Sequence, residues 1–238
     1  METTSPPTST RRSGERDSAT GRAVWLLLAG LLVVAAFYST GSGAQPRDAL
    51  YDPDLALGGV IFYAVLVGLA ALVALFFGDV RRTLGFRAFE RRWLWWAAGV
   101  AVATVIVSLV LEPFLHAGEK QGLAPTRWEP EHAGVFVANA LVTVVLGPFA
   151  EETFFRGIGV RAFAALGSVV AIVATAVVFG LVHGIVVALP PLVFLGAGLA
   201  WIRIRADSVW PAIAAHTAYN GLGILFLVLS WAAGTDPS

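Results

Sequence analysis

The sequence has no cysteine and few charged residues. The lack of cysteine excludes disulfide bonds, thiolate zinc sites, iron–sulfur clusters and a cysteine nucleophile. Charged residues make up 13% of the 238 positions, against about 25% in an ordinary soluble domain. The 16 basic and 16 acidic residues cancel, so the chain has no excess positive charge with which to bind nucleic acid. With 57% hydrophobic residues, this composition predicts a membrane protein without a nucleic-acid partner.

Long apolar runs separated by polar breaks predict an all-α fold, a polytopic transmembrane helical bundle of about seven spans. A helix needs about 20 apolar residues to cross the hydrocarbon core. The fourth span should break or kink at Gly147-Pro148, because proline removes a helix hydrogen bond. The run 192–202 is short, and it either crosses the membrane or re-enters it. The expected spans are 23–38, 55–77, 93–111, 133–166, 169–189, 192–202 and 209–231.

The ends and loops of the chain predict its orientation. Residues 1–21 lack apolar periodicity and are expected to form a disordered cytoplasmic tail. Four arginines lie between residues 11 and 22 and five in the loop 78–92, whereas the loops on the other side are poor in basic residues. Basic loops stay in the cytoplasm. We therefore expect a multi-pass protein of the cell membrane with its N-terminus in the cytoplasm and its C-terminus outside. The first span also fits a signal peptide, which is the alternative reading of 23–38.

Ionisable residues stand out in the apolar second half of the chain. Between residues 133 and 200 the only charged residues are Glu151, Glu152, Arg156 and Arg161, and such groups at membrane depth are candidates for function. Glu152 and Arg156 are four residues apart, so they share a helix face and can form an ion pair. Glu151 points about 100° away and is left without a partner. A desolvated carboxylate of this kind suits a general base.

Two histidines lie on later apolar helices. Glu151 is sixteen residues before the turn at Gly167 and His183 is sixteen after it, so an antiparallel hairpin places both at one depth, about 24 Å along the helices from the turn. His216 and Asn220 share a face of the last helix. Each residue alone fits a structural contact between helices, but together they favour a site. His116 and His132 are expected at the surface, and Phe154, Phe155 and Phe179 in packing.

The segments EETFFR at 151–156, FGLVH at 179–183 and HTAYN at 216–220 resemble the EExxxR, FxxxH and HxxxN motifs of the CPBP family. This family comprises the CAAX-protease and bacteriocin-processing intramembrane endopeptidases. The resemblance covers residues 133–232, which would form the catalytic helical core. Residues 22–132 would supply three N-terminal spans with their loops, and 233–238 a C-terminal tail.

The resemblance implies a role for each matched residue. Glu151 and His183 would activate a water molecule for attack on a peptide carbonyl, and His216 and Asn220 would stabilise the oxyanion. Arg156 would hold the first helix through Glu152, with Phe179 of the second motif in support.

The metal requirement stays open between two mechanisms. The set Glu151, His183 and His216 could hold Zn²⁺ with water in the fourth position, as in a metalloprotease. Glu151 could instead deprotonate water without any cofactor. Asn220 favours the metal-free mechanism, because an amide suits an oxyanion donor better than a ligand.

The expected activity is hydrolysis of a membrane-associated protein or peptide within the lipid bilayer. A bacteriocin-like leader or an anti-sigma-type regulator fits this substrate class better than a prenylated protein does. Two alternatives remain. One is a non-catalytic bacteriocin-immunity or adaptor protein with the same fold. The other is a small-solute transporter, for which the sequence shows no internal repeat.

Overall fold

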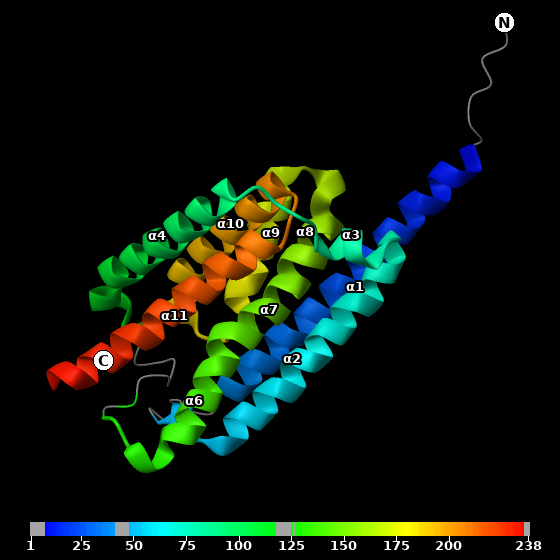
Figure 1. Cartoon of the computed structure of the whole chain (residues 1–238). Coiled ribbons are helices and arrows are strands. Elements are labelled where there is room, and N and C mark those ends of the chain that lie inside the picture. The colour runs from blue at the N-terminus through cyan, green and yellow to red at the C-terminus, as the bar shows by residue number, and fades with distance from the viewer. Residues whose placement is uncertain (1–7, 41–47, 118–124, 126, 236–238) are drawn as a thin grey trace, which may run out of the picture.

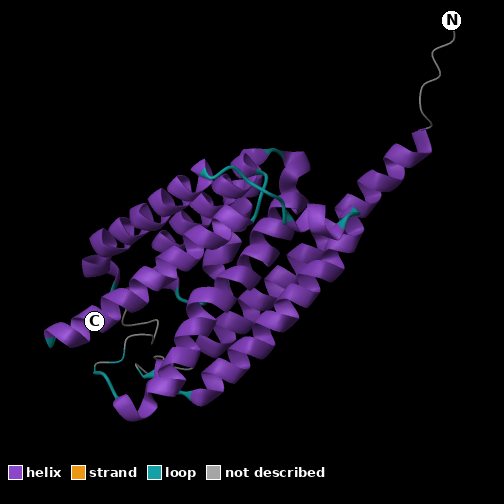
Figure 2. Ribbon diagram, in the orientation of Figure 1, coloured by secondary structure: helices purple, strands orange, loops and turns teal. Residues whose placement is uncertain are grey.

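The chain folds into an all-α bundle. The computed structural model describes residues 8–40, 48–117, 125 and 127–235, and these residues form helices and loops without a strand, as Figure 2 shows. The predicted fold class, a polytopic helical bundle, is confirmed. The longer helices are α1 (Thr8–Thr40), α2 (Pro53–Ala74), α4 (Arg92–Leu115), α9 (Ser168–Leu181), α10 (Leu189–Ala206) and α11 (Trp210–Ala233). The shorter α-helices are α3 (Val80–Leu84), α6 (Ala133–Leu141), α7 (Gly147–Glu152) and α8 (Val160–Phe163).

The helices run along a common axis, and the start of α1 and the end of α11 lie at opposite ends of the bundle (Figure 1). At the end nearer the N-terminus, the loop after α3 meets the turn between α10 and α11. There the Val209 amide donates to the Gly85 carbonyl at 2.9 Å, and the Ser208 hydroxyl donates to the Arg87 carbonyl at 2.8 Å. At the other end, the Trp231 indole donates to the Pro125 carbonyl at 2.8 Å.

Six helices within the described ranges are long and apolar enough to cross a membrane. Large apolar side chains cover their outer surfaces; Leu27 and Val34 of α1 are 63% and 67% exposed. Apolar exposure on this scale is expected where lipid rather than water is the solvent. The six helices are Ser18–Ser39, Pro53–Phe77, Arg92–Leu115, Pro130–Leu166, Val186–Ala206 and Trp210–Ala233.

The predicted span 169–189 is wrong as a single helix. Helix α9 ends at Leu181 after 14 residues, and Gly184 follows in a left-handed conformation with φ of 69°. Pro190 and Pro191 do not end a helix as expected. They lie in the first turn of α10, where proline is tolerated because its missing N–H would be unpaired anyway. The predicted short run 192–202 is accordingly part of the 18-residue helix α10.

Of the two outcomes expected at Gly147-Pro148, a break or a kink, the break is wrong. A continuous helical stretch of 37 residues runs from Pro130 to Leu166 and includes two π-helical turns, η4 (Val142–Leu146) and η5 (Thr153–Gly159). The first of these turns directly precedes Gly147-Pro148. A π-helical turn changes the local hydrogen-bond pattern, so the proline is accommodated without ending the helix. Helix α7, which carries both glutamates of the first motif, lies between the two turns.

The N-terminal segment differs from the expected disordered tail. Helix α1 begins at Thr8, so residues 8–21 extend the first span; residues 1–7 lie outside the described residues, as do 236–238 of the predicted C-terminal tail. Adding residues to an existing helix costs less than starting one, which explains this extension. The fully buried Trp25 fixes α1 in the bundle by donating its indole N–H to the Phe154 carbonyl at 3.2 Å.

Candidate active site

The residues of the three motifs come from three parts of the fold. Glu151 and Glu152 end helix α7, and His216 and Asn220 lie in the first half of α11. His183 is not on a helix, because α9 ends two residues before it. The structure brings the glutamates of α7 and His216 of α11 into direct contact, as the following distances show.

Glu152 forms a buried charged cluster with Arg156 and His216. Arg156 Nη1 donates to Glu152 Oε1 at 2.8 Å, and both side chains are fully buried. The predicted ion pair is therefore present. His216 Nδ1 donates to the same Glu152 oxygen at 3.0 Å, a contact that sequence spacing does not reveal. A buried charge is stabilised only when it is paired and hydrogen-bonded, and this cluster satisfies that condition for Glu152 Oε1. Glu152 Oε2 and Arg156 Nε are buried without a hydrogen-bond partner among the described residues.

Helices α9 and α10 complete the surroundings of Arg156. Its Nη2 donates to the Gly196 carbonyl at 3.0 Å. Its guanidinium lies over the Phe179 ring at 4.3 Å from the ring centre, within the range of a cation–π interaction. Phe179, the first residue of the second motif, thus has an electrostatic role as well as the packing role expected for it. Gly196 allows this close approach, because an added Cβ would lie 3.1 Å from Arg156 Nη2 and crowd it.

Glu151 has a partner that the sequence analysis missed. Tyr63 of α2 donates its hydroxyl to Glu151 Oε1 at 3.1 Å. The expectation that Glu151 lacks a partner is therefore wrong. A tyrosine in an apolar span carries no distinctive sequence signal, since its ring suits the bilayer. Gly147 lets the hydroxyl approach, because an added Cβ there would lie 2.9 Å from the Tyr63 oxygen.

The second oxygen of Glu151 faces His216. His216 Nε2 lies 4.0 Å from Glu151 Oε2, and the Glu151 side chain is 15% exposed. Glu151 Oε2 itself is buried and forms no hydrogen bond within the described part of the chain. His216 thus lies between the two carboxylates. Its Nδ1 forms a hydrogen bond with Glu152, and its Nε2 lies 4.0 Å from Glu151.

His183 is oriented by its own segment. Its Nδ1 donates to the Phe179 carbonyl at 2.7 Å, which leaves Nε2 as the nitrogen available to other groups. The Phe179 ring packs against both histidine rings, with centroids 4.9 Å from His183 and 5.6 Å from His216. Glu151 and His183 share no direct hydrogen bond among the described residues, but His183 lies close enough to interact electrostatically with Glu151 and His216.

Asn220 contacts the first π-helical turn. Its side-chain amide donates to the Thr143 carbonyl at 2.8 Å. This bond links α11 to η4, directly before the helix that carries the glutamates. One N–H of the amide is therefore engaged in a structural contact, and the second N–H has no partner in the part of the chain that the structure describes.

The predicted zinc ligands do not form a compact set. Among the described residues, one group of three histidine or acidic side chains has ligand atoms within 4.8 Å of one another, and it consists of Glu129, Glu131 and His132. Glu151, His183 and His216 do not meet this spacing. Both histidines do have Nδ1 fixed by an acceptor, as zinc-binding histidines do. The zinc-bound alternative therefore stays a prediction, and the mechanism proposed for this site does not depend on a metal.

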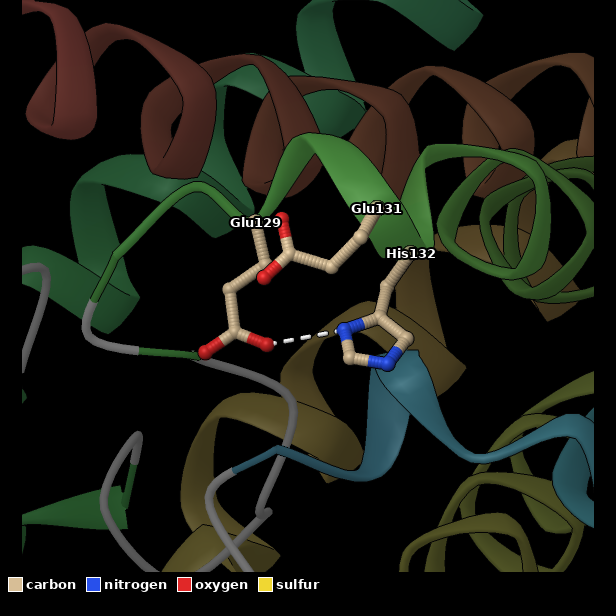
Figure 3. Close-up of side chains that lie close together, drawn as sticks. All are labelled: Glu129, Glu131 and His132. Carbon is tan, nitrogen blue, oxygen red and sulfur yellow. Dashed lines mark hydrogen bonds and ion pairs between the residues drawn. The ribbon is translucent and has the colours of Figure 1, made fainter.

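The Glu129 group lies at the end of the bundle near the C-terminus, in the loop before α6. His132 Nδ1 lies 2.9 Å from Glu129 Oε2, as Figure 3 shows with Glu131 beside them. Arg127 Nε donates to the other oxygen of Glu129 at 3.1 Å. These bonds from Arg127 and His132 lower the pKa of Glu129. His132 is 47% exposed and His116 is exposed, which confirms the surface positions expected for them.

Comparison with known proteins identifies the segment that holds the motifs. Residues 133–222 match the family model described as type II CAAX prenyl endopeptidase Rce1-like. No curated protein and no solved structure matches the chain. The matched segment contains Glu151, His183 and His216 with their neighbours. The match covers fewer than half of the 238 residues. Over this segment the chain is similar to the CAAX-type endopeptidases, the CPBP family whose motifs the three segments resemble, and the match supports membership of that family.

Proposed function

We propose that the chain is an intramembrane endopeptidase that hydrolyses a peptide bond of a membrane-associated protein or peptide. Glu151 and His183 activate water, and His216 and Asn220 stabilise the oxyanion. The observation that carries this proposal is the 4.0 Å gap between Glu151 Oε2 and His216 Nε2. It leaves an unbonded carboxylate oxygen beside a ring nitrogen in a largely buried site.

The gap between these two atoms suits a bound water. Two hydrogen bonds of about 2.8 Å that meet at 90–110° span about 4.0–4.6 Å. A water held in this way lies next to Glu151 Oε2, the oxygen that accepts its proton. Tyr63 holds the other oxygen of the same carboxylate, so the orientation of Oε2 is fixed before substrate arrives. Such positioning lowers the barrier of a bimolecular attack.

His183 supplies a second acceptor for the attacking water. Because Nδ1 donates to the Phe179 carbonyl, Nε2 of the neutral ring carries the lone pair. During attack, the water oxygen bonds to the carbonyl carbon and one water proton moves to Glu151. The carbonyl oxygen becomes the oxyanion. When the carbon–nitrogen bond breaks, Glu151 returns the proton to the departing amine nitrogen.

His216 and Asn220 lie on one face of α11, from which both can reach the oxyanion. His216 donates from Nε2 when its ring is protonated on both nitrogens, and the carboxylates of Glu151 and Glu152 on either side balance that charge. Asn220 has its second amide N–H for this purpose. Donors fixed in a water-poor site stabilise an oxyanion more strongly than water does. Arg156 acts as a positioning residue, because it holds Glu152 and thereby His216.

A comparison of membrane peptides tests this proposal. Membranes that contain wild-type protein are compared by mass spectrometry with membranes that contain Glu151→Gln. We expect a peptide bond of a membrane protein that is cut only by the wild type. The matched control is Glu131→Gln, an exposed glutamate at one end of the bundle, which should cut normally. Identical peptides from wild type and Glu151→Gln would contradict proteolysis and favour a non-catalytic adaptor.

The two residues that activate water should not contribute independently. Glu151→Gln and His183→Ala should each abolish cleavage, and the double variant should be no worse than either alone, because both act on one water molecule. Each variant should unfold at nearly the wild-type temperature, which shows that the loss is chemical. Full cleavage by folded His183→Ala would remove His183 from the mechanism.

A further inference from the structure

A cavity of about 370 Å³ lies at the end of the bundle nearer the N-terminus, away from the candidate active site. Its wall comes from the 3-10 turn after α2, helix α3 with the residues on both sides of it, helix α8 and the end of α10. Four arginines and two aspartates supply its charged groups: Arg82, Arg87, Arg161, Arg203, Asp79 and Asp207. The lining therefore carries an excess of positive charge.

The two aspartates are already engaged in contacts of their own. Asp79 accepts the backbone N–H of Arg82 at 2.8 Å and caps α3. Asp207 forms an ion pair with Arg87 and lies 3.6 Å from Arg203 Nη1. The Asp207 carboxylate is thus shared between the guanidinium groups of Arg87 and Arg203. Arg82 and Arg161 form no ion pair within the described ranges, so their charges are not balanced by a protein carboxylate.

Arg203 is the most buried of these cations. Its side chain is 8% exposed, and its Nε is buried without a hydrogen-bond partner among the described residues. The guanidinium lies flat against Gly85, where an added Cβ would be 2.5 Å from Nη2. A buried cation whose partner is distant and shared is poorly compensated. An anion in the adjoining cavity would supply the missing charge.

The cavity lies where two membrane spans end, and this position indicates which anions can reach it. Phe77, which also lines the cavity, is the last residue of the long span Pro53–Phe77. Arg203 is three residues from the end of the span Val186–Ala206. Both spans therefore end at the cavity, which is the level of lipid headgroups. Next to it, Leu75 and Phe76 are 62% and 41% exposed, and they offer an apolar surface for acyl chains.

We propose that this cavity binds a phosphate group, carried by an anionic phospholipid headgroup or free in solution. Guanidinium groups bind phosphate through paired, charge-assisted hydrogen bonds. Several arginines around one cavity can share a single phosphate between them. The volume is ample, since a water molecule takes about 30 Å³. The site is separate from Glu151 and His216, so its occupancy is measurable without a protease assay.

Thermal unfolding of the purified full-length protein in a neutral detergent tests the site. The additions are short-chain phosphatidylglycerol, short-chain phosphatidylcholine, inorganic phosphate, and sodium chloride at the same ionic strength. A ligand that binds the folded state raises the unfolding temperature. The test variants are Arg82→Gln and Arg161→Gln, whose side chains are exposed. Because Arg161 also lies over the Phe77 ring at 5.6 Å, the unfolding temperature of each variant without additive is its own reference. The control is Arg205→Gln, also exposed and on α10, but absent from the cavity wall.

Phosphatidylglycerol should raise the unfolding temperature by several degrees more than phosphatidylcholine or sodium chloride does. This rise should shrink in both test variants and persist in Arg205→Gln, which would support a lipid headgroup. An equal rise with inorganic phosphate, lost in the same variants, would support the site and assign it to free phosphate. The absence of any rise, or an undiminished rise in both test variants, would overturn the proposal.

Discussion

Tyr63 of α2 donates a hydrogen bond to Glu151 of α7 at 3.1 Å. The two residues belong to different halves of the chain, since the family match begins at residue 133 and Tyr63 precedes it by 70 positions. An N-terminal span therefore takes part in the candidate active site instead of serving only as a membrane anchor. The contact leads directly to a test of how Glu151 is positioned.

Tyr63→Phe should lower kcat/KM for peptide cleavage by about tenfold to a hundredfold. A hydrogen bond to a charged group contributes about 1.5–3 kcal/mol, and each 1.36 kcal/mol changes a rate tenfold. The ring remains, so the unfolding temperature should stay close to that of the wild type. The measurement is cleavage of the substrate identified by the membrane comparison. Tyr38→Phe is the control, because Tyr38 is 87% exposed. Equal cleavage rates for both variants and the wild type would show that catalysis does not depend on the hydrogen bond from Tyr63 to Glu151.

Arg156→Ala should destabilise the protein by about 3–5 kcal/mol, because it leaves the buried Glu152 carboxylate without its cation. Thermal or denaturant unfolding in detergent measures the loss. Replacing Glu152 and Arg156 together by leucine should recover part of the stability. Recovery should be incomplete, since His216 Nδ1 and the Gly196 carbonyl each lose a partner, at about 1–3 kcal/mol for each unpaired group. Wild-type stability in Arg156→Ala would mean that water replaces the arginine.

Gly196→Ala should cost about 1–3 kcal/mol of stability, the usual result of overpacking, and should reduce cleavage. The added Cβ would lie 3.0 Å from the Ala176 backbone and 3.1 Å from Arg156 Nη2. The matched control is Gly223→Ala in α11, where an added Cβ meets nothing within 4 Å. Unfolding measurements on the two variants compare crowding at otherwise similar helical glycines. If both variants unfold like the wild type, α10 is not tightly packed against Arg156.

Reporter fusions test the orientation that the arginine distribution predicts. Fusions at Asp79 should report the cytoplasm, and fusions at Gly118 and Ser238 the opposite side. Helix α11 ends at the far end of the bundle from the start of α1 (Figure 1), an arrangement consistent with opposite signals from fusions before α1 and after α11. A cytoplasmic signal at Gly118 would reverse the orientation, and one at Ser238 would mean that α11 does not cross.

The sequence predicts contacts between residues that are close along the chain better than contacts between residues that are far apart. The ion pair between Glu152 and Arg156 is local, and helical spacing alone predicts it. The contact of His216 with Glu152 joins residues 64 positions apart, and that of Tyr63 with Glu151 joins residues 88 apart. Such contacts depend on which helices become neighbours, and apolar periodicity does not specify that choice.

The wrong helix boundaries come from the prolines. Gly147-Pro148 predicts a break or a kink, and the helix does not break there because the π-helical turn Val142–Leu146 accommodates the proline. Pro190-Pro191 was expected to end a span, yet it begins α10. Proline has no backbone N–H, so it disrupts the interior of a helix but is tolerated in the first turn. Whether a proline ends a helix or begins one therefore depends on where the helix starts. The sequence does not show the start of a helix when apolar residues lie on both sides.

The early end of α9 at Leu181 has a consequence for the supply of water to the candidate active site. Peptide groups outside a helix need hydrogen-bond partners that lipid cannot provide, so irregular backbone at membrane depth persists only inside protein or beside a wet cavity. The segment that carries His183 is of this kind. The non-helical turn that carries His183 therefore lies inside protein or beside water rather than against lipid, and a wet cavity there would supply the water that hydrolysis consumes.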